Sequence, residues 1–301
     1  MSTILLSGAS GFIGSRLAQS FASDGHRIVP LVRGRPSSDH TVAWDPEKGS
    51  IDREALARAR PDVVINLAGE PIARRWTPAR RHRIRESRVR GTEALADALA
   101  GSPMKPKVFL SGSAVGYYGA HRGDETVDET SAPGPDFLAQ TARDWERGTE
   151  RAGSAGIRVV VLRTGLVLSR SGGVLARMLL PFRLGVGGRL GSGRQWMSWI
   201  AMDDIVAAIR FLVDTPTMNG PVNLVAPEPA RNVEFTKTLA HVLRRPAVFP
   251  VPAILLELLF GTMADNTILA SQRVIPKRLA GAGFQFRHPR LEDALRFALT
   301  R

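Results

Sequence analysis

The first fourteen residues, MSTILLSGASGFIG, constrain the fold more than any other part of the chain. A short apolar run at residues 4–6 leads into Gly8, Gly11 and Gly14, and a helical pattern follows over residues 12–21. Glycines let the backbone turn sharply and approach a ligand closely, while the free N–H groups and dipole at a helix start favour a pyrophosphate. The stretch therefore predicts a strand, a tight turn and a helix that together hold a dinucleotide.

The end of the next apolar run, residues 26–32, bears on which dinucleotide is bound. Folds that hold NAD usually place an Asp or Glu roughly 20 residues past the glycines, to accept the ribose 2′-hydroxyl. This chain has Arg33 there, followed by Gly34 and Arg35. A guanidinium cannot accept that proton, but it can grip a 2′-phosphate through its planar fork of donors. We expect NADP(H) as the cofactor; the alternative is that Arg33 is one more surface arginine.

Strand patterns and helical patterns alternate along the chain. The apolar runs lie at residues 4–6, 26–32, 41–44, 62–67, 107–111, 158–162 and 221–225. The helical patterns lie at residues 12–21, 53–59, 78–99, 136–151, 172–184, 203–213, 232–243 and 252–260. This alternation predicts an α/β fold with a doubly wound parallel sheet. We expect a dinucleotide-binding domain over residues 1–220 and a smaller C-terminal substrate lobe over residues 221–301.

Composition and charge exclude several classes of protein. No apolar run approaches the roughly 20 residues that span a bilayer, and the start lacks the pattern of a signal peptide, so we expect a cytoplasmic protein without a membrane partner. The chain has no cysteine, and its six histidines show no metal-ligand spacing, so no metal is expected. The net charge of +13 raises nucleic acid as a partner. However, the arginines of residues 74–90 scatter around a helix, so a solvated basic helix is favoured.

Ordered motifs through nearly the whole chain carry a family resemblance. They are GASGFIG at residues 8–14, NLAG at 66–69, RWT at 75–77, SR at 87–88, SAVGYYG at 113–119, PFRLGVGG at 181–188, GSGRQWMSWI at 191–200 and GFQFRHP at 283–289. Together they resemble the epimerase-family proteins of the atypical short-chain dehydrogenase/reductase type, which carry a C-terminal domain of unknown function. The resemblance implies an extended Rossmann fold with NADP(H) in its crevice.

Carried over by position, the resemblance also implies the cofactor contacts. Those under the pyrophosphate are Gly8, Ser10, Gly11, Phe12, Ile13 and Gly14. Those at the 2′-phosphate and along the adenosine side are Arg33, Leu67, Ala68 and Gly69. Arg88 is a further contact to the cofactor or to an anionic substrate, or else an arginine on a helix face.

The chain departs from the family chemistry at the proton donor. Short-chain dehydrogenases use a Tyr with a Lys four residues on, because the ammonium then lies one helical turn from the phenol and lowers its pKa. Here the two tyrosines, Tyr117 and Tyr118, are followed four residues later by His121 and Arg122. The helical stretch at residues 137–146, where the pair normally sits, contains no phenol. The usual Tyr-Lys pair is therefore absent.

Three residues are candidates for a displaced catalytic group. They are Ser113, Tyr117 and Tyr118, with His121 or a nearby arginine to activate a phenol. Alternatively, the tyrosines pack under the nicotinamide and Ser113 satisfies loop backbone. We expect the acidic residues 124–129 to form a solvated loop, and Asp203 and Asp204 to cap a helix.

Two functions from different classes follow. The leading hypothesis is an NADP(H)-dependent oxidoreductase or epimerase-like enzyme acting on a small carbonyl or sugar-derived substrate. The second is a non-catalytic NADP(H)-binding sensor or scaffold. The substrate, the direction of hydride transfer and the oligomeric state stay open.

Overall fold

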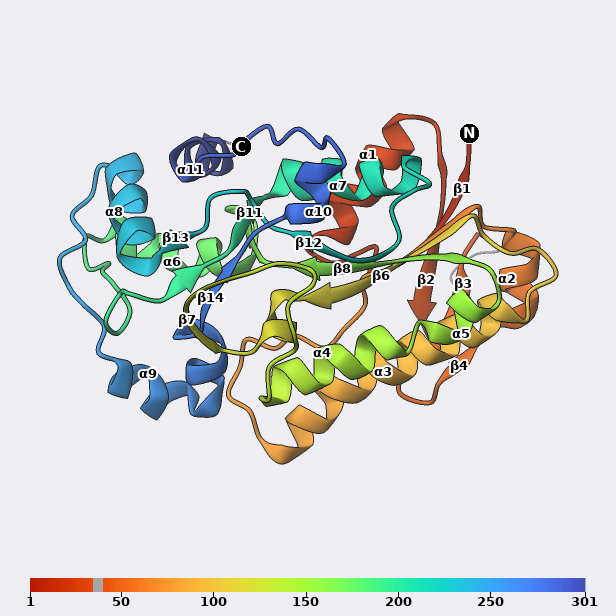
Figure 1. Cartoon of the computed structure of the whole chain (residues 1–301), viewed down its shortest axis with the longest axis horizontal. Helices are drawn as coiled ribbons and strands as arrows, with labels where there is room; N and C mark the ends of the chain where they lie inside the picture. Colours follow the sequence, from red (N-terminus) through yellow and green to blue (C-terminus); the bar gives the residue numbers. More distant parts are fainter. Residues whose placement is uncertain (35–39, 301) are drawn as a thin grey trace.

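An eight-stranded sheet forms the centre of the molecule (Figure 1). The computed structural model describes residues 1–34 and 40–300. The strand order is β12 (Gly220–Leu224), β8 (Arg158–Thr164), β6 (Val108–Ala114), β5 (Val63–Asn66), β1 (Thr3–Ser7), β2 (Arg27–Arg33), β3 (Val42–Asp45) and β4 (Ser50–Ile51). Neighbouring strands are parallel except β3 and β4, which pair antiparallel. The predicted α/β fold with a doubly wound sheet is confirmed.

Helices cover both faces of the sheet (Figure 1). On one face lie α1 (Gly14–Ser23) and α7 (Met202–Asp214). On the other lie α2 (Arg53–Ala59), α3 (Pro78–Ala100), α4 (Phe137–Arg147) and α5 (Glu150–Ser154). Because successive side chains of a strand point to opposite faces, β1 is buried on both: Ile4 and Leu6 join the core under α1, and Leu5 joins the core under α3.

The strand order fixes where a ligand can bind. From β1 the chain builds outward through β2 and β3 to one edge, then returns to the other side of β1 with β5, β6, β8 and β12. The order therefore reverses between β1 and β5, whose ends meet at the register pair Ser7 and Asn66. In open parallel sheets, ligands bind in the crevice at such a switch point. The glycine loop after β1 and residues 67–69 after β5 both border it.

A second core forms the C-terminal lobe. It is built from β9 (Leu166–Leu168), α6 (Gly173–Arg183), β11 (Trp199–Ala201), α8 (Asn232–Leu243) and α11 (Leu291–Thr300). Trp199 and Phe235 lie fully buried within it. The expected boundary at residue 220 coincides with the start of β12, which belongs to the central sheet, whereas α6 precedes it but packs in the lobe. The division of the chain into domains stays a prediction.

Short elements connect these two cores. They are the 3₁₀ turn η1 (Val115–Tyr118), β7 (His121–Val127), β10 (Trp196–Met197), β13 (Ala230–Arg231), α9 (Ala253–Phe260), the π-helical turn η2 (Ala264–Ile268), β14 (Ser271–Val274) and α10 (Lys277–Gly281). β14 pairs parallel with β7 and thereby joins the lobe to the segment after η1. Within the described ranges, no helix combines the length and apolar character that crossing a membrane requires.

Three local expectations were wrong. The helix expected over residues 136–151 is interrupted at Gly148, where α4 ends. Asp203 does not cap α7: Ala201 is the N-cap residue and Asp203 lies in the first turn, where its charge favours the helix dipole. Asp204 is fully buried and accepts the N–H groups of Arg287 at 2.7 Å and His288 at 3.0 Å, so it fastens the C-terminal segment onto α7.

Candidate functional site

The glycine loop after β1 is shaped by close backbone approaches. Gly8 adopts a left-handed φ of +69°, and a Cβ there would lie 3.1 Å from the carbonyl of Leu67. A Cβ on Gly14 would lie only 2.1 Å from the oxygen of Gly8, so α1 can begin against the turn only because residue 14 is glycine. The N–H of Gly11 closes the turn by donating to the same oxygen at 2.8 Å. Each of the three predicted glycines therefore has a distinct geometric role.

The start of α1 is open to an anion. Among the described residues, no side chain caps this helix at Ile13, and its first turn carries no acidic residue. Ser10 and Gly11 are exposed beside it. Unsatisfied N–H groups and the positive end of the helix dipole thus face the crevice. Phe12 points away from solvent against Gly172 and Gly173, which joins the loop to the start of α6.

A buried hydroxyl ties the ends of β1 and β5 together. Ser7 Oγ donates to Asn66 Oδ1 at 2.6 Å and accepts the N–H groups of Leu67 at 3.0 Å and Ala68 at 3.1 Å. Asn66 in turn donates through Nδ2 to Thr92 on α3 at 2.9 Å. Sequence reasoning did not find this network. It holds the backbone of residues 67–69, predicted to line the cofactor, at the switch point.

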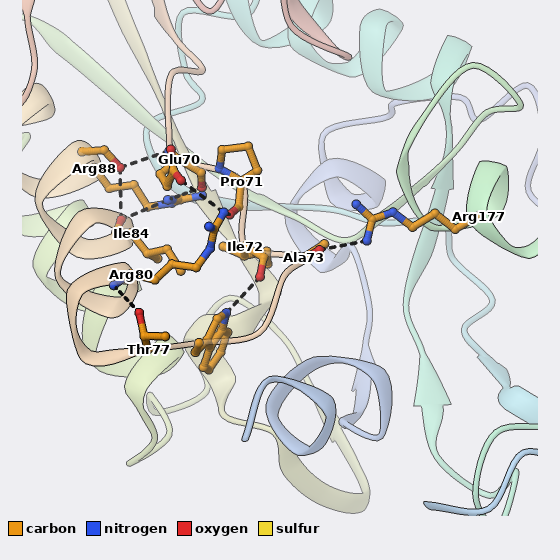
Figure 2. A network of polar contacts seen from close by, with 11 residues as sticks. Glu70, Pro71, Ile72, Ala73, Thr77, Arg80, Ile84, Arg88 and Arg177 are labelled. Atoms are coloured by element: carbon orange, nitrogen blue, oxygen red, sulfur yellow. Dashed lines mark hydrogen bonds and ion pairs between the residues drawn. The ribbon is translucent and has the colours of Figure 1, made fainter. Parts of the chain in front are cut away.

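Arg88 lies directly behind the exposed Gly69. Its Nη1 donates to the main-chain oxygens of Glu70 and Ile84, each at 3.0 Å (Figure 2). Its guanidinium also lies 5.2 Å from the ring of Trp145. A Cβ on Gly69 would lie 3.0 Å from Cζ of Arg88. Burial lowers the pKa of Arg88 to about 10, against the opposing charge of Glu70, so the side chain stays cationic at neutral pH. Its contact with the cofactor or an anionic substrate stays a prediction.

The loop after β5 reaches from the sheet to the lobe. Arg80 on α3 donates to Glu70 Oε1 and to the oxygen of Pro71, both at 3.2 Å. From the opposite side Arg177 on α6 donates to the oxygen of Ala73 at 3.0 Å, as Figure 2 shows. Arginines from two separate helices therefore hold the loop from both sides.

Arg33 lies at the carboxyl end of β2, and its contact with a 2′-phosphate stays a prediction. It is the last residue of β2, it is exposed, and it pairs in register with Trp44 of β3. Arg35 lies outside the described residues. The position of Arg33 at the carboxyl edge of the sheet is on the same side as the glycine loop, because β1 and β2 run parallel.

The three predicted catalytic residues gather around Arg163 of β8. Ser113, at the end of β6, donates from Oγ to Glu146 Oε1 at 2.7 Å. Arg163 binds the same carboxylate with Nε to Oε1 and Nη2 to Oε2, each at 2.8 Å. The guanidinium lies 3.5 Å from the ring centroid of Tyr117, and Nη1 donates to Tyr118 Oη at 3.1 Å. Burial alone lowers the pKa of Arg163, but the bonds to Glu146 raise it above its ordinary value.

The two tyrosines differ in their surroundings. Tyr118 is fully buried, and its hydroxyl donates to Asn223 Oδ1 of β12 at 2.7 Å. Burial raises the pKa of Tyr118 to about 12, although the charge of Arg163 opposes the rise. Tyr117 is only half-buried and lies on the face of the Arg163 guanidinium. Tyr118 thus joins β12 to the site as a neutral phenol, while Tyr117 borders it.

Two expectations about the neighbouring residues were wrong. His121 contacts Asp265, with 3.2 Å between Nε2 and Oδ2, and the group that lies on Tyr117 is instead the expected alternative, an arginine, Arg163. The acidic loop is not solvated throughout: Glu129 is 7% exposed and its Oε1 accepts the N–H of Asn223 at 3.0 Å. Sequence reasoning missed Glu146, Arg163 and Asn223. A signal existed for Arg163, since a charged residue follows the apolar run at residues 159–162.

Comparison with known proteins decides the family. The model of the NAD dependent epimerase/dehydratase family matches residues 4–225, and that of a domain of unknown function matches residues 251–298. The chain belongs to the NAD-dependent epimerase/dehydratase family. Family members include an epimerase family protein of Mycobacterium bovis, Mb2239, which is 42% identical over 99% of this chain and 98% of its own. The chloroplastic SDR39U1 homologue of Arabidopsis thaliana is 38% identical over 98% of this chain and 86% of its own.

A solved structure of the same family agrees with the fold. Human epimerase family protein SDR39U1, crystallised with NADPH, superposes with a TM-score of 0.90 at 33% identity and covers 99% of both chains. UDP-glucose 4-epimerase of Thermotoga maritima, at 19% identity and a TM-score of 0.77, shares the fold. The predicted family resemblance and its extended Rossmann fold are confirmed.

Proposed function

We propose that this protein binds NADP(H) across the carboxyl ends of β1 and β5 and uses it to oxidise or reduce a small hydroxyl- or carbonyl-bearing substrate derived from a sugar. The observation that carries the choice of NADP(H) is Arg33, which ends β2 where a fold that selects NAD presents a carboxylate. The NADPH in the human relative supports this choice. The glycine loop, the uncapped start of α1 and the backbone of residues 67–69 would hold the nucleotide.

Fluorescence titration with NADPH and NADH tests the choice of cofactor. Arg33→Ala should weaken NADPH binding by about tenfold to a hundredfold, the value of a charge-assisted hydrogen bond, and leave NADH binding unchanged. The matched control is Arg27→Ala at the opposite end of β2, where the exposed side chain donates to the oxygen of Ala59. Equal or tighter binding of NADH by the natural protein contradicts the proposal.

The chemistry that we propose rests on the direction of one hydrogen bond. α4 occupies the place where short-chain dehydrogenases carry Tyr and Lys, and here it carries Glu146. A carboxylate can only accept, so the Ser113 hydroxyl donates its hydrogen bond to Glu146 and keeps its oxygen lone pairs for another donor. A substrate hydroxyl is such a donor, so Ser113 would orient the alcohol form of the substrate. NADP(H), when bound, supplies or removes the hydride, and Tyr117 is the phenol that we assign to proton exchange.

Single-turnover measurements separate this enzyme from a sensor. We expect NADP⁺ reduction with a panel of sugar-derived alcohols, or NADPH oxidation with the matching carbonyls. Tyr117→Phe and Ser113→Ala should each slow it by about 10²- to 10⁴-fold without changing the affinity for NADPH. A non-catalytic sensor is the second candidate, favoured by the 5% exposure of Ser113. Tight NADPH binding without turnover of any compound would support the sensor.

A further inference from the structure

The chain from α6 to α9 carries an uneven share of the exposed apolar side chains. Among the described residues, the large apolar side chains that stay exposed all fall within residues 174–259, apart from Met1 and Met104. The most exposed of them are Leu180, Leu184, Val248, Ile254 and Leu258, at 68% to 76%. Single exposed apolar residues are ordinary on a protein surface, but a concentration of them on one part of the molecule marks an interaction site.

Helix α9 is the clearest part of this surface. Its sequence AILLELLF contains one charged residue, Glu257, and Leu256 is its one buried residue. A helix that is apolar on all sides is normally surrounded by a protein core or by lipid. Here α9 lies at one end of the molecule, away from the central sheet (Figure 1). Its packing inside the protein does not account for its composition.

The exposed apolar side chains continue from α9 towards the end of α6. Residues 184–191 and 246–251 run side by side: Val251 donates to the oxygen of Arg189 at 2.9 Å, and Phe249 donates to that of Gly187 at 3.3 Å. These contacts bring Val186 of one segment close to Val248 of the other, immediately before α9. We call the exposed apolar side chains of these two adjacent segments and of α9 the apolar face; its principal residues are Leu184, Val186, Val248, Phe249, Ile254 and Leu258.

The surroundings of the apolar face are basic. Residues 174–189 and 244–260 contain five arginines and a single carboxylate, that of Glu257. Where α8 ends, a pocket of about 470 Å³ is lined by one histidine and three arginines, namely His241, Arg244, Arg245 and Arg296. Glu292 contacts His241 and Arg296 from α11, so the pocket keeps an excess of positive charge. Figure 1 shows α8 and α9 at the same end of the molecule, joined by the chain that carries Val248.

We propose that the apolar face docks on a membrane surface rich in anionic phospholipid. α9 would lie in the interface with Ile254 and Leu258 among the acyl chains, and the cationic pocket would take a lipid phosphate. A second copy of the chain fits less well, because self-association would bring two basic surfaces together. This docking requires no membrane span, but it replaces our expectation from sequence that the protein has no membrane partner.

Vesicle flotation with the full chain tests this proposal. Binding to vesicles of phosphatidylcholine with phosphatidylglycerol should exceed binding to phosphatidylcholine alone, and it should fall as salt is added. The double variant Ile254→Ser and Leu258→Ser should bind about tenfold or more weakly, since it removes two inserting side chains. Arg244→Ser with Arg245→Ser should also weaken binding by about tenfold, and only to the anionic vesicles.

Met104→Ser is the matched control, because Met104 is 54% exposed but lies between α3 and β6. It should leave vesicle binding unchanged, and NADPH titration of every variant checks that the fold is intact. Failure to float with vesicles of either composition would overturn the proposal, as would equal flotation of the Ile254 and Leu258 double variant. Light scattering that shows a dimer, converted to monomer by the same double variant, would instead assign the apolar face to a second copy.

Discussion

We assign one side of the crevice to the nucleotide and the other to the substrate, and these two sides are built from different parts of the chain. The nucleotide side consists mainly of backbone, in the glycine loop and residues 67–69, which two adjacent parallel strands bring together. The substrate side consists of side chains, with Glu146 and Arg163 linking Ser113 to the tyrosines. Every residue except proline offers a main-chain N–H group, so this side tolerates changes of residue type unless a new side chain fills the space around the loop. A network of buried charges depends on every member.

The largest expected effect is on the substrate side. Arg163→Met would leave the Glu146 carboxylate without its cation, and Arg163 is only 3% exposed, so unfolding in urea should show a loss of about 3–5 kcal/mol. Arg58→Met is the control, because the ion pair of Arg58 with Glu54 is exposed and should change stability by about 0.5 kcal/mol or less. A loss as small as that of the control would contradict the distinction between the two sides.

On the nucleotide side, adding a single methyl group at Gly14 should be enough to lower both stability and NADPH affinity. Gly14→Ala would place Cβ 2.1 Å from the oxygen of Gly8, so the loop must shift and stability should fall by about 1–3 kcal/mol, together with NADPH affinity. Gly281→Ala in α10 meets no atom within 4 Å and should be neutral or slightly stabilising. Both glycines lie in helices, where alanine is intrinsically favoured. If the two variants changed the melting temperature equally, the contact between residue 14 and the oxygen of Gly8 would be unimportant.

Arg88 is a side chain that supports the backbone of the nucleotide side. Arg88→Lys keeps a positive charge but loses the planar fork behind Gly69, so NADPH binding should weaken by about threefold to tenfold. Arg83→Lys, on the exposed surface of the same helix, is the control and should leave the titration unchanged. Unaltered affinity in the Arg88 variant would mean that residues 67–69 keep their position without it.

The smallest effect on stability is expected away from the crevice, where the segment after β7 contacts α10. A hydrogen bond from Lys277 lowers the pKa of Asp128 from 3.8 to about 2, so this carboxylate stabilises the fold above pH 3.8 and loses that effect as the pH falls towards 2. Asp128→Asn should remove about 1 kcal/mol or less at neutral pH, because Lys277 is largely exposed. Urea titrations at several pH values should show the difference vanish near pH 2; a constant difference would contradict this assignment.

Sequence patterns predicted a helix or strand well where all the residues that determine it lie within that helix or strand. The helical patterns at residues 53–59 and 232–243 coincide with α2 and α8. The strand, turn and helix at the start of the chain also follow from neighbouring residues, since Gly8 and Gly14 act on backbone a few positions away. The interrupted helix at Gly148 was missed, because its apolar pattern continues through the break into α5.

The amino-acid sequence by itself determined the α/β class, the glycine-rich turn after β1 and the arginine that ends β2, because these depend on backbone preference and on the order of elements. Only the tertiary structure decided the substrate side. Tyr118 meets Asn223 across 105 positions, and Glu146 becomes the partner of Ser113 only when α4 packs beside β6. A buried charge is stabilised by whichever opposite charge or donor the fold brings to it, and residues adjacent in sequence do not specify that partner.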